Sequence, residues 1–227
     1  MRLHNRPRTL SSFVLALACL LAASAVVRAT FEDKQLSVYA PQGTYSVRVI
    51  DDENRESADL MAVLAPISKV VLRIDGNTAR FPGGIAEAHF NHGENSAQVG
   101  QKRVRFPGKI SIVEGRVFVP VVALPALLQE MVGMRGELHE AGRRLFVENT
   151  FSHFTVELKK GESPEMLLSF PQRVNPNITQ EGNKLRLVFR QEPVTMTGSG
   201  ITFDDPRLTG LHFEEKNGTA EITISGA

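Results

Sequence analysis

The amino-acid sequence predicts a mainly β protein of the α+β class, in which a small α+β module with two short helices precedes an antiparallel β-sandwich. Three observations indicate this fold class. Apolar and polar residues alternate with a period of two along most of the chain, only two segments have helical periodicity, and no helical segment follows residue 151. Alternation by twos is typical of strands that bury one face.

In the first module, expected at 36–149, strands are predicted wherever this alternation is clear. Pro41-Gln42-Gly43 and Asp75-Gly76-Asn77 are strong turn signals that connect neighbouring strands into hairpins. The expected strands span 36–39, 45–49, 69–74, 78–81, 104–106, 109–113, 116–119 and 144–147.

Two segments of the first module, 57–65 and 123–132, place apolar residues at helical spacing. Pro125 suits the first turn of the second helix, and Gly133 suits its C-terminal end. A shift of 64 positions lays Leu60 and Leu64 on Leu124 and Leu128. Each half of the module is therefore predicted to contain a strand, a helix and a hairpin. A duplicated unit and two unrelated units of ordinary architecture both explain this pattern.

The second domain is expected at 151–227 and contains only strand signals. Gly, Pro, Asn and Asp turn signals separate most of the short alternating runs. The expected strands span 154–158, 166–170, 184–189, 194–197, 200–203, 211–213 and 220–225. Seven strands at spacings of about ten residues are typical of an antiparallel sandwich.

The first 29 residues have the three parts of a signal peptide. A basic start with Arg2, Arg6 and Arg8 precedes an apolar run at 13–27 and small residues at the exit. The run is shorter than the roughly 20 apolar residues that a transmembrane helix requires. We therefore expect a signal peptide at 1–29, with cleavage after Ala25 as an alternative. The protein would be exported to the periplasm or cell envelope, without a membrane anchor after cleavage.

The composition argues against several classes of function. Removing residues 1–29 takes away four arginines and no acidic residue, so the formal net charge falls from +1 to −3, which argues against a nucleic-acid partner. Cys19, the only cysteine, leaves with the signal peptide, so neither a disulfide nor a thiolate zinc site is expected. With no Trp and only two Tyr, the chain is poorly suited to stack sugars on aromatic rings.

His89, His92 and Glu94 form the one cluster of metal-ligating residue types. Zinc accepts histidine and carboxylate ligands, but Asn91 and Gly93 favour a loop or hairpin over a helix that would align the ligands. We expect a polar surface loop there, no metal and no cofactor.

The sequence also predicts no catalytic residue. It lacks the serine turn of the hydrolases, and its paired acids fall at turns, which Asp favours for backbone reasons. The remaining histidines of the expected domains stand alone and are predicted to be exposed or hydrogen-bonded: His139, His153 and His212.

Basic residues cluster around the turn at 106–108. The cluster consists of Lys102, Arg103, Arg105 and Lys109. Such side chains bind carboxylates, including those of peptidoglycan stem peptides, through charge-assisted hydrogen bonds. We predict that these four residues contribute most to binding of the cell wall. The basic pairs at 143–144 and 159–160 are instead expected to lie on a solvated surface of mixed charge.

The segment Gly115 to Leu124 resembles the signature of the copper amine oxidase N-terminal-like domain, with Glu114 in place of the usual Asn and Val122 in place of the usual Arg. That module has no copper requirement. Residues 151–227 resemble the amidase N-terminal domain, a β-sandwich that targets N-acetylmuramoyl-L-alanine amidases to the envelope; the similar segments are 154–158, 168–170 and 184–189. Together the two resemblances cover nearly all of the chain after the signal peptide.

This pair of resemblances implies the non-catalytic front part of an exported amidase. We expect an envelope module that binds peptidoglycan or positions a cell-wall hydrolase, without catalysis by this chain. One alternative is that the chain is the N-terminal fragment of a zinc amidase, whose His and Glu ligand run is absent from the sequence. The other is an envelope scaffold that binds proteins.

Overall fold

The computed structural model describes residues 34–52, 55–161 and 164–226, which belong to one compact unit. The predicted signal peptide at 1–29 lies outside these residues. Strands make up 53% and helices 9% of the described residues, which confirms the predicted mainly β fold. None of the helices in this part of the chain has the length and apolar character needed to cross a bilayer.

The largest sheet combines strands from both halves of the first module. Its strands are β1 (Gln35–Ala40), β2 (Gly43–Asp52), β3 (Arg55–Asp59), β9 (Ser111–Val113), β10 (Arg116–Pro120), β11 (Gly136–His139) and β12 (Arg144–Val147). They lie in the order β11-β12-β1-β2-β3-β10-β9. The pair β1–β12 is parallel and the other neighbours are antiparallel.

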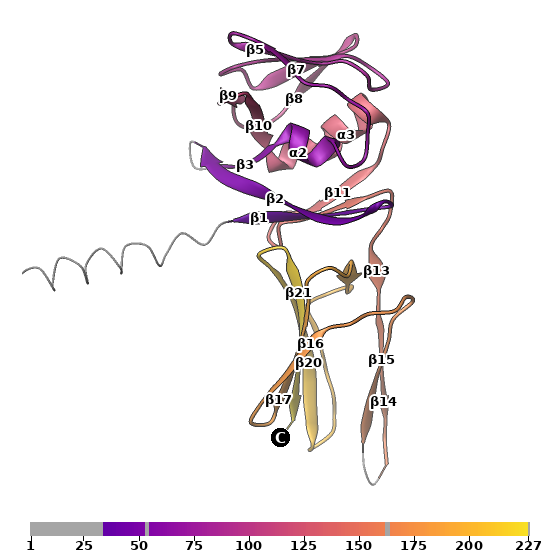
Figure 1. Ribbon diagram of the computed structural model, residues 1–227. Coiled ribbons are helices and arrows are strands. Elements are labelled where there is room, and N and C mark those ends of the chain that lie inside the picture. Colours follow the sequence, from indigo (N-terminus) through magenta and orange to yellow (C-terminus); the bar gives the residue numbers. More distant parts are fainter. Residues whose placement is uncertain (1–33, 53–54, 162–163, 227) are drawn as a thin grey trace, which may run out of the picture. The chain divides into compact units, whose positions relative to one another are not determined.

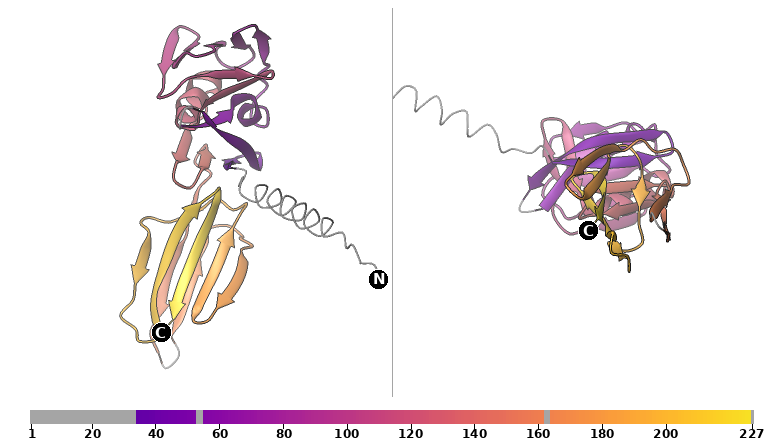
Figure 2. Two further views of the ribbon diagram at one scale, coloured as in Figure 1. Left: turned by 90° about the vertical axis from the view of Figure 1, so that its left-hand side faces the viewer. Right: turned by 90° about the horizontal axis from the view of Figure 1, so that it is seen from below.

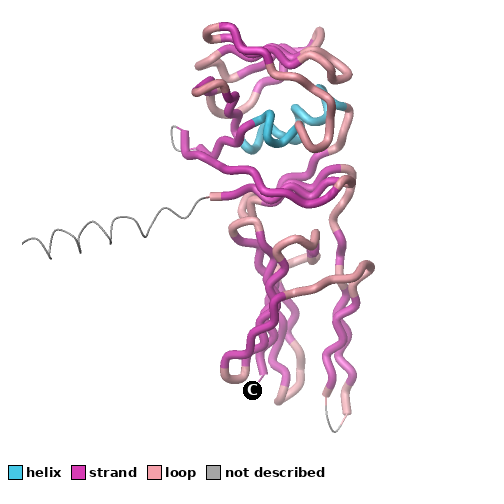
Figure 3. The backbone as a smooth tube through the Cα atoms, viewed as in Figure 1, coloured by secondary structure: helices cyan, strands magenta, loops and turns pink. Residues whose placement is uncertain are grey.

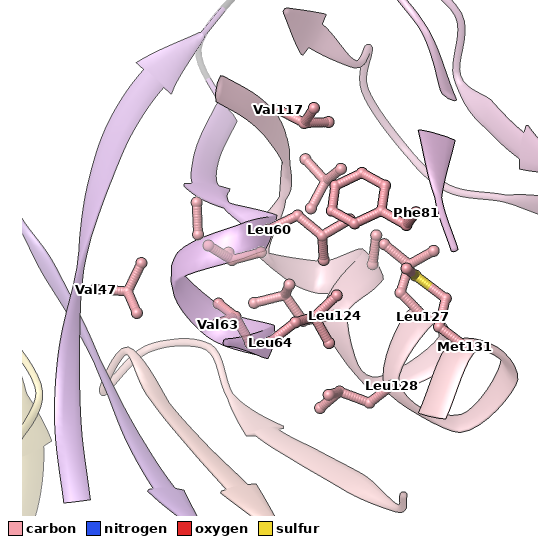
Figure 4. Close-up of a cluster of buried hydrophobic side chains, with 14 of the residues drawn as sticks. Val47, Leu60, Val63, Leu64, Phe81, Val117, Leu124, Leu127, Leu128 and Met131 are labelled. Carbon is pink, nitrogen blue, oxygen red and sulfur yellow. The ribbon is translucent and has the colours of Figure 1, made fainter. Parts of the chain in front are cut away.

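A second sheet is an antiparallel meander of five consecutive strands: β4 (Arg73–Asp75), β5 (Thr78–Phe81), β6 (Ala88–Asn91), β7 (Ser96–Val99) and β8 (Lys102–Arg105). Two α-helices, α2 (Leu60–Leu64) and α3 (Leu124–Val132), lie between this meander and the larger sheet (Figures 1 and 3). The apolar faces of the helices and of both sheets form one buried cluster. Figure 4 shows part of it, with Leu64 of α2 beside Leu124 of α3 and with Phe81 of β5 near Leu60.

The second helix has the ends that the sequence predicts. Pro125 occupies the first turn, where its missing N–H group costs no hydrogen bond. Gly133 ends the helix in the left-handed conformation, with φ 74°, and donates its N–H to the carbonyl of Gln129 at 3.2 Å. A 3-10 turn, η2 (Val121–Ala123), precedes the helix.

The first helix is shorter than the predicted range of 57–65. Residues 57–59 belong to β3, which is hydrogen-bonded to strands on both sides, β2 and β10. The helix begins only after Asp59, whose carboxylate accepts the N–H groups of Met61 and Ala62. The apolar spacing was correctly read as helical, but pairing within the sheet determines where the helix starts.

Two predicted strands are also shorter than expected. The strand at 69–74 is regular only from Arg73, because its partner β5 ends at Phe81 and the next residue, Pro82, has no N–H to donate. The strand at 109–113 begins at Ser111. Ile110 instead pairs with the turn at 93–94, donating to the Glu94 carbonyl at 2.7 Å and accepting the Gly93 N–H at 2.8 Å.

Both halves of the first module contain the predicted strand, helix and hairpin in that order. The two strands, β3 and β10, pair with each other antiparallel. The hairpins diverge, since β4–β5 belongs to the meander and β11–β12 joins the larger sheet beside β1. The two halves therefore share the order of their elements but place their hairpins in different sheets, and a duplicated origin stays a hypothesis.

Every regular element described after residue 151 is a strand. All seven predicted strands are present, and β13 and β16 are additional. The bounds are β13 (Ser152–His153), β14 (Thr155–Lys159), β15 (Glu165–Ser169), β16 (Asn177–Glu181), β17 (Lys184–Phe189), β18 (Val194–Thr195), β19 (Gly200–Thr202), β20 (Leu208–Lys216) and β21 (Thr219–Gly226). Five form an antiparallel sheet in the order β16-β17-β21-β20-β19 (Figure 2).

This sheet and the hairpin β14–β15 share a second hydrophobic core. Phe154 stacks on Phe170 with ring centroids 5.5 Å apart and also contacts Phe213 at 5.8 Å, while Phe170 packs on Phe189 at 5.6 Å. Aromatic rings at these separations stabilise a core beyond the area that they bury. The buried residues of the first core lie between 36 and 147 and those of the second between 154 and 222, within one compact unit.

Arg144 was expected on a solvated surface, but its side chain is completely buried. It donates to the Tyr39 hydroxyl at 3.2 Å, to the Val194 carbonyl at 2.8 Å and to the carboxylate of Glu215. Its guanidinium also lies 4.8 Å from the ring centroid of Tyr39 and 4.9 Å from that of Phe146. A charge that is paired and hydrogen-bonded in this way can be buried, which alternation along β12 cannot reveal.

Glu215 also accepts a hydrogen bond from His139, at 2.7 Å between Oε2 and Nδ1. This hydrogen bond raises the pKa of His139 above its ordinary value. Burial raises the pKa of Glu215, but the hydrogen bond from His139 and the charge of Arg144 outweigh it, so that the pKa is lowered overall. We call Arg144, Glu215, His139 and Tyr39 the junction network.

Replacing Glu215 should leave the buried guanidinium of Arg144 without its counter-charge. We expect Glu215→Gln to lower the free energy of unfolding by about 3–5 kcal/mol, because one partner of a buried pair is removed. Glu214, exposed on the same strand, is the matched control, and Glu214→Gln should change stability by less than about 0.5 kcal/mol. Urea unfolding of the unchanged chain and the two variants measures the loss of stability. Equal losses in the two variants would contradict the role of Glu215 as the counter-charge of Arg144.

The junction network should make stability depend on pH. The raised pKa of His139 means that its contribution is complete below the ordinary value of 6.5 and is lost as the pH rises through the folded-state pKa. The lowered pKa of Glu215 gives a contribution that is complete above 4.5 and is lost as the pH falls through its folded-state pKa. Urea midpoints measured from pH 6 to 9 should therefore fall, and His139→Gln should flatten that fall. An unchanged slope in the variant would rule out His139 as its source.

Candidate functional site

The four basic residues predicted to bind the cell wall lie on and beyond β8, the edge strand of the meander. Alternation along this strand sends Lys102 and Val104 to one face of the sheet, and Arg103 and Arg105 to the other. Lys109 lies in the loop between β8 and β9. The structure therefore brings Arg103 and Arg105 together and separates Lys102 from them.

Lys102 belongs to the inner face of the meander. The register places it at the end of a row formed by Phe81, Ala88 and Val99, all of them buried. From there its ammonium group reaches α3 and lies 2.9 Å from both carboxylate oxygens of Glu130. This ion pair connects the edge of the meander to the helix layer.

Arg103 and Arg105 share the outer face of the meander with two arginines that are distant in sequence. The register runs in one row across all five strands: Arg73, Arg80, His89, Gln98 and Arg103. Arg105 lies in the adjacent row, opposite Ser96. We call the four arginines, with His89 and Gln98, the arginine face.

The inner face of the same strands explains why the arginines point outward. The neighbouring row consists of Ile74, Ala79, Phe90, Ala97 and Val104, all of which belong to the hydrophobic core or pack against it. Because residues alternate between the faces, burying this row places the arginine row on the opposite side.

The arginine face carries uncompensated positive charge. All four arginines are exposed, and none takes part in a hydrogen bond or ion pair within the described residues. The acidic groups near it are Glu87, whose carboxylate lies 3.4 Å from His89 Nε2, and Asp75 at the end of β4. Positive side chains therefore outnumber negative ones.

The spacing of the face suits a ligand with several anionic groups. Neighbouring strands are about 4.8 Å apart, so Arg73 and Arg80 form one pair, while three strand intervals, roughly 14 Å, separate Arg80 from Arg103. Arg103 and Arg105 form a second pair along β8. Each guanidinium presents a planar fork of donors that matches a carboxylate or phosphate.

Sequence reasoning missed Arg73 and Arg80 because neither lies in a basic run. The signal was nevertheless present in the predicted hairpin turn at 75–77, since a two-residue loop sets Arg73 opposite Arg80. The next two strands, β6 and β7, were not predicted, so the connection from Arg80 to Arg103 could not be made.

In the histidine segment 89–94, residues 89–91 belong to strand β6 and only 92–94 lie in the turn to β7. The segment is therefore part of a hairpin, and the expected surface loop is limited to that turn. His92 Nδ1 accepts the N–H of Ile112 at 3.0 Å, and Glu94 accepts a hydrogen bond from Asn91 at 3.1 Å. His92 thus fastens the turn to β9, and the bond between Asn91 and Glu94 closes the turn itself. Within 34–52, 55–161 and 164–226, no group of three metal-ligating side chains converges.

Comparison with known proteins gives no independent assignment. No protein-family model, no curated protein and no solved structure matches the chain. The resemblance to an amidase front region therefore stays a prediction from the sequence.

If the arginine face serves a ligand, it should not stabilise the fold. Arg73 and Arg80 are cross-strand neighbours of like charge, which is unfavourable. We expect Arg80→Gln to raise the free energy of unfolding by about 0.2–1 kcal/mol at low salt, and the gain to shrink in 1 M salt because the repulsion is screened. Arg116, exposed opposite Val113, is the control site, and the free energy of unfolding of Arg116→Gln should show no such salt-dependent gain. A clear loss of stability in Arg80→Gln would assign the arginine a structural role.

Proposed function

We propose that this chain is an exported, non-catalytic module of the cell envelope that binds peptidoglycan and thereby positions a cell-wall amidase. The observation that carries the proposal is the arginine face, with four exposed guanidinium groups on one side of a five-stranded sheet. The signal-peptide pattern at 1–29 and the resemblance to the front part of exported amidases support the compartment and the ligand. In this proposal 36–149 is the α+β module and 151–227 the β-sandwich.

Peptidoglycan fits the chemistry of the face. Its stem peptides carry carboxylates that repeat along a polymer, and a repeated anion can occupy the two arginine pairs at once. Binding at several weak sites on one polymer multiplies the affinity without any strong single contact. Exposed arginines also lose little solvation when they bind at the surface, so the interaction should be reversible and sensitive to salt.

The proposed mechanism involves no bond cleavage. The face holds anionic groups by charge-assisted hydrogen bonds, and its strands are fixed by the core beneath them. Attachment of this kind would keep a hydrolase close to its substrate, whether that enzyme is fused to this module or supplied separately.

Sedimentation with purified sacculi, stripped of protein, tests the proposal. We expect the chain to sediment with sacculi in low salt and to be released as the salt concentration rises. Replacing Arg73, Arg80, Arg103 and Arg105 together by Gln should remove most of the bound fraction, because all four guanidinium groups of the arginine face are lost.

The control variant removes the same number of exposed charges elsewhere, by changing Lys159, Lys160, Arg173 and Arg135 to Gln. It should sediment like the unchanged chain. Equal retention of both variants would exclude the arginine face, and binding only to sacculi that still carry protein would favour the scaffold alternative. Release of dye from labelled sacculi by the chain alone would overturn the non-catalytic assignment.

A further inference from the structure

A groove of about 630 Å³ lies where β1 and β2 approach β16, β17 and β21. The strand faces that line it are those turned away from the hydrophobic cores. On β17, Arg186 and Val188 face the groove, while Leu185 and Leu187 alternate with them and pack in the core. The groove is thus a product of the same alternation that forms the core, on the opposite side of the strands.

The groove is lined mainly by hydroxyl, amide and basic side chains. Ser37 and Ser46 contribute from the larger sheet, and Asn177 and Thr179 from β16. No aromatic ring is among its lining residues. A ligand would therefore be recognised by hydrogen bonds and charge and not by stacking on a ring.

The charges of the groove favour an anion. Its basic residues are Arg186, Arg190 and Lys216, against a single acidic residue, Glu221. Arg186 and Glu221 neutralise each other in a two-point ion pair. The side chains of Arg190 and Lys216 are exposed and make no hydrogen bond or ion pair within the described residues. The charge of Lys216 helps to lower the pKa of Glu221, but Arg186 already pairs with that carboxylate, so Arg190 and Lys216 leave the groove with a net positive charge for a negative group.

One wall of the groove is held in place before any ligand binds. The turn at 216–219 is fastened by Gly218, whose N–H donates to the Gly142 carbonyl at 2.7 Å and whose carbonyl accepts the Tyr39 hydroxyl at 3.3 Å. Gly218 has φ 77°, and a side chain there would collide with the Ser37 hydroxyl. A preformed site loses less conformational entropy on binding than a mobile one.

We propose that this groove binds a sugar acid, a pyranose that carries hydroxyls, an N-acyl amide and one carboxylate. Hydroxyl and amide side chains match the first two groups, and Arg190 with Lys216 matches the carboxylate. The volume lies within the range of small-molecule sites. The inference rests on the proposed function in taking its ligand from the cell wall, where the carboxylate of the sugar acid is free only after an amidase has cleaved its amide bond to the stem peptide. It concerns a surface separate from the arginine face.

Two soluble sugars test the inference with the full chain. N-acetylmuramic acid carries a lactyl ether with a carboxylate on O3, where N-acetylglucosamine has a hydroxyl, and the two are otherwise alike. In an NMR titration, we expect only N-acetylmuramic acid to shift backbone amides at 177–179, 186–190 and 216–219. Arg190→Gln with Lys216→Gln should weaken this binding about tenfold, since hydrogen bonds to charged groups are lost. Lys159→Gln with Lys160→Gln is the control of equal charge and should leave it unchanged.

The outcomes separate this inference from the proposed function. Equal shifts by both sugars would show that Arg190 and Lys216 do not recognise the carboxylate. The absence of shifts at millimolar sugar would show that the groove does not bind the sugar. If N-acetylmuramic acid is without effect while sacculi still bind through the arginine face, only this inference fails. If the sugar acid binds while sacculi do not, the proposed function fails and the groove stands.

Discussion

The buried guanidinium of Arg144 is the constraint on which the connection of the two cores depends. Its partners come from segments far apart in sequence: Tyr39 on β1, Glu215 on β20 and the carbonyls of Glu192 and Val194. Removing a charge from water costs several kcal/mol unless it is paired and hydrogen-bonded. The net contribution of such a network to stability can be small, but any arrangement that lacks one of its partners leaves a buried charge unsatisfied. The network therefore selects one packing of these segments over its alternatives.

One periodicity produces the cores and both proposed binding surfaces. Every strand of the meander buries one row of side chains, and the opposite row must then face water, where arginines are tolerated. The same holds for β17, with Leu187 in the core and Arg186 in the groove. Side chains in the exposed rows contribute little to stability. Substitutions there can therefore create or alter a binding surface without a large effect on folding.

The sequence allowed the class of the fold and most strands to be predicted, because long alternating runs and Gly-containing turns are local signals. The unpredicted strands lacked such signals. On β16 every residue from Asn177 to Glu181 is exposed, so no apolar face marks it. On β6 and β7, the small residues Ala88 and Ala97 occupy core positions where a pattern search expects larger side chains.

Half of the candidate site was predicted from the sequence, since Arg103 and Arg105 lie in a basic run. Arg73 and Arg80 join them only through the register of five strands. The burial of Arg144 could not be predicted from the sequence, because its partners come from segments that only the tertiary structure brings together.

The groove and the junction network share structural parts, and this links stability to recognition. The Tyr39 hydroxyl accepts a hydrogen bond from Arg144 Nε and donates one to the Gly218 carbonyl, so the turn that carries Lys216 is positioned from the junction. A change that loosens the junction should therefore also displace one wall of the groove. The arginine face has no such dependence, because its strands are held by the helix layer and the core of the meander. Of the two surfaces, only the groove should lose its shape when the junction network is weakened.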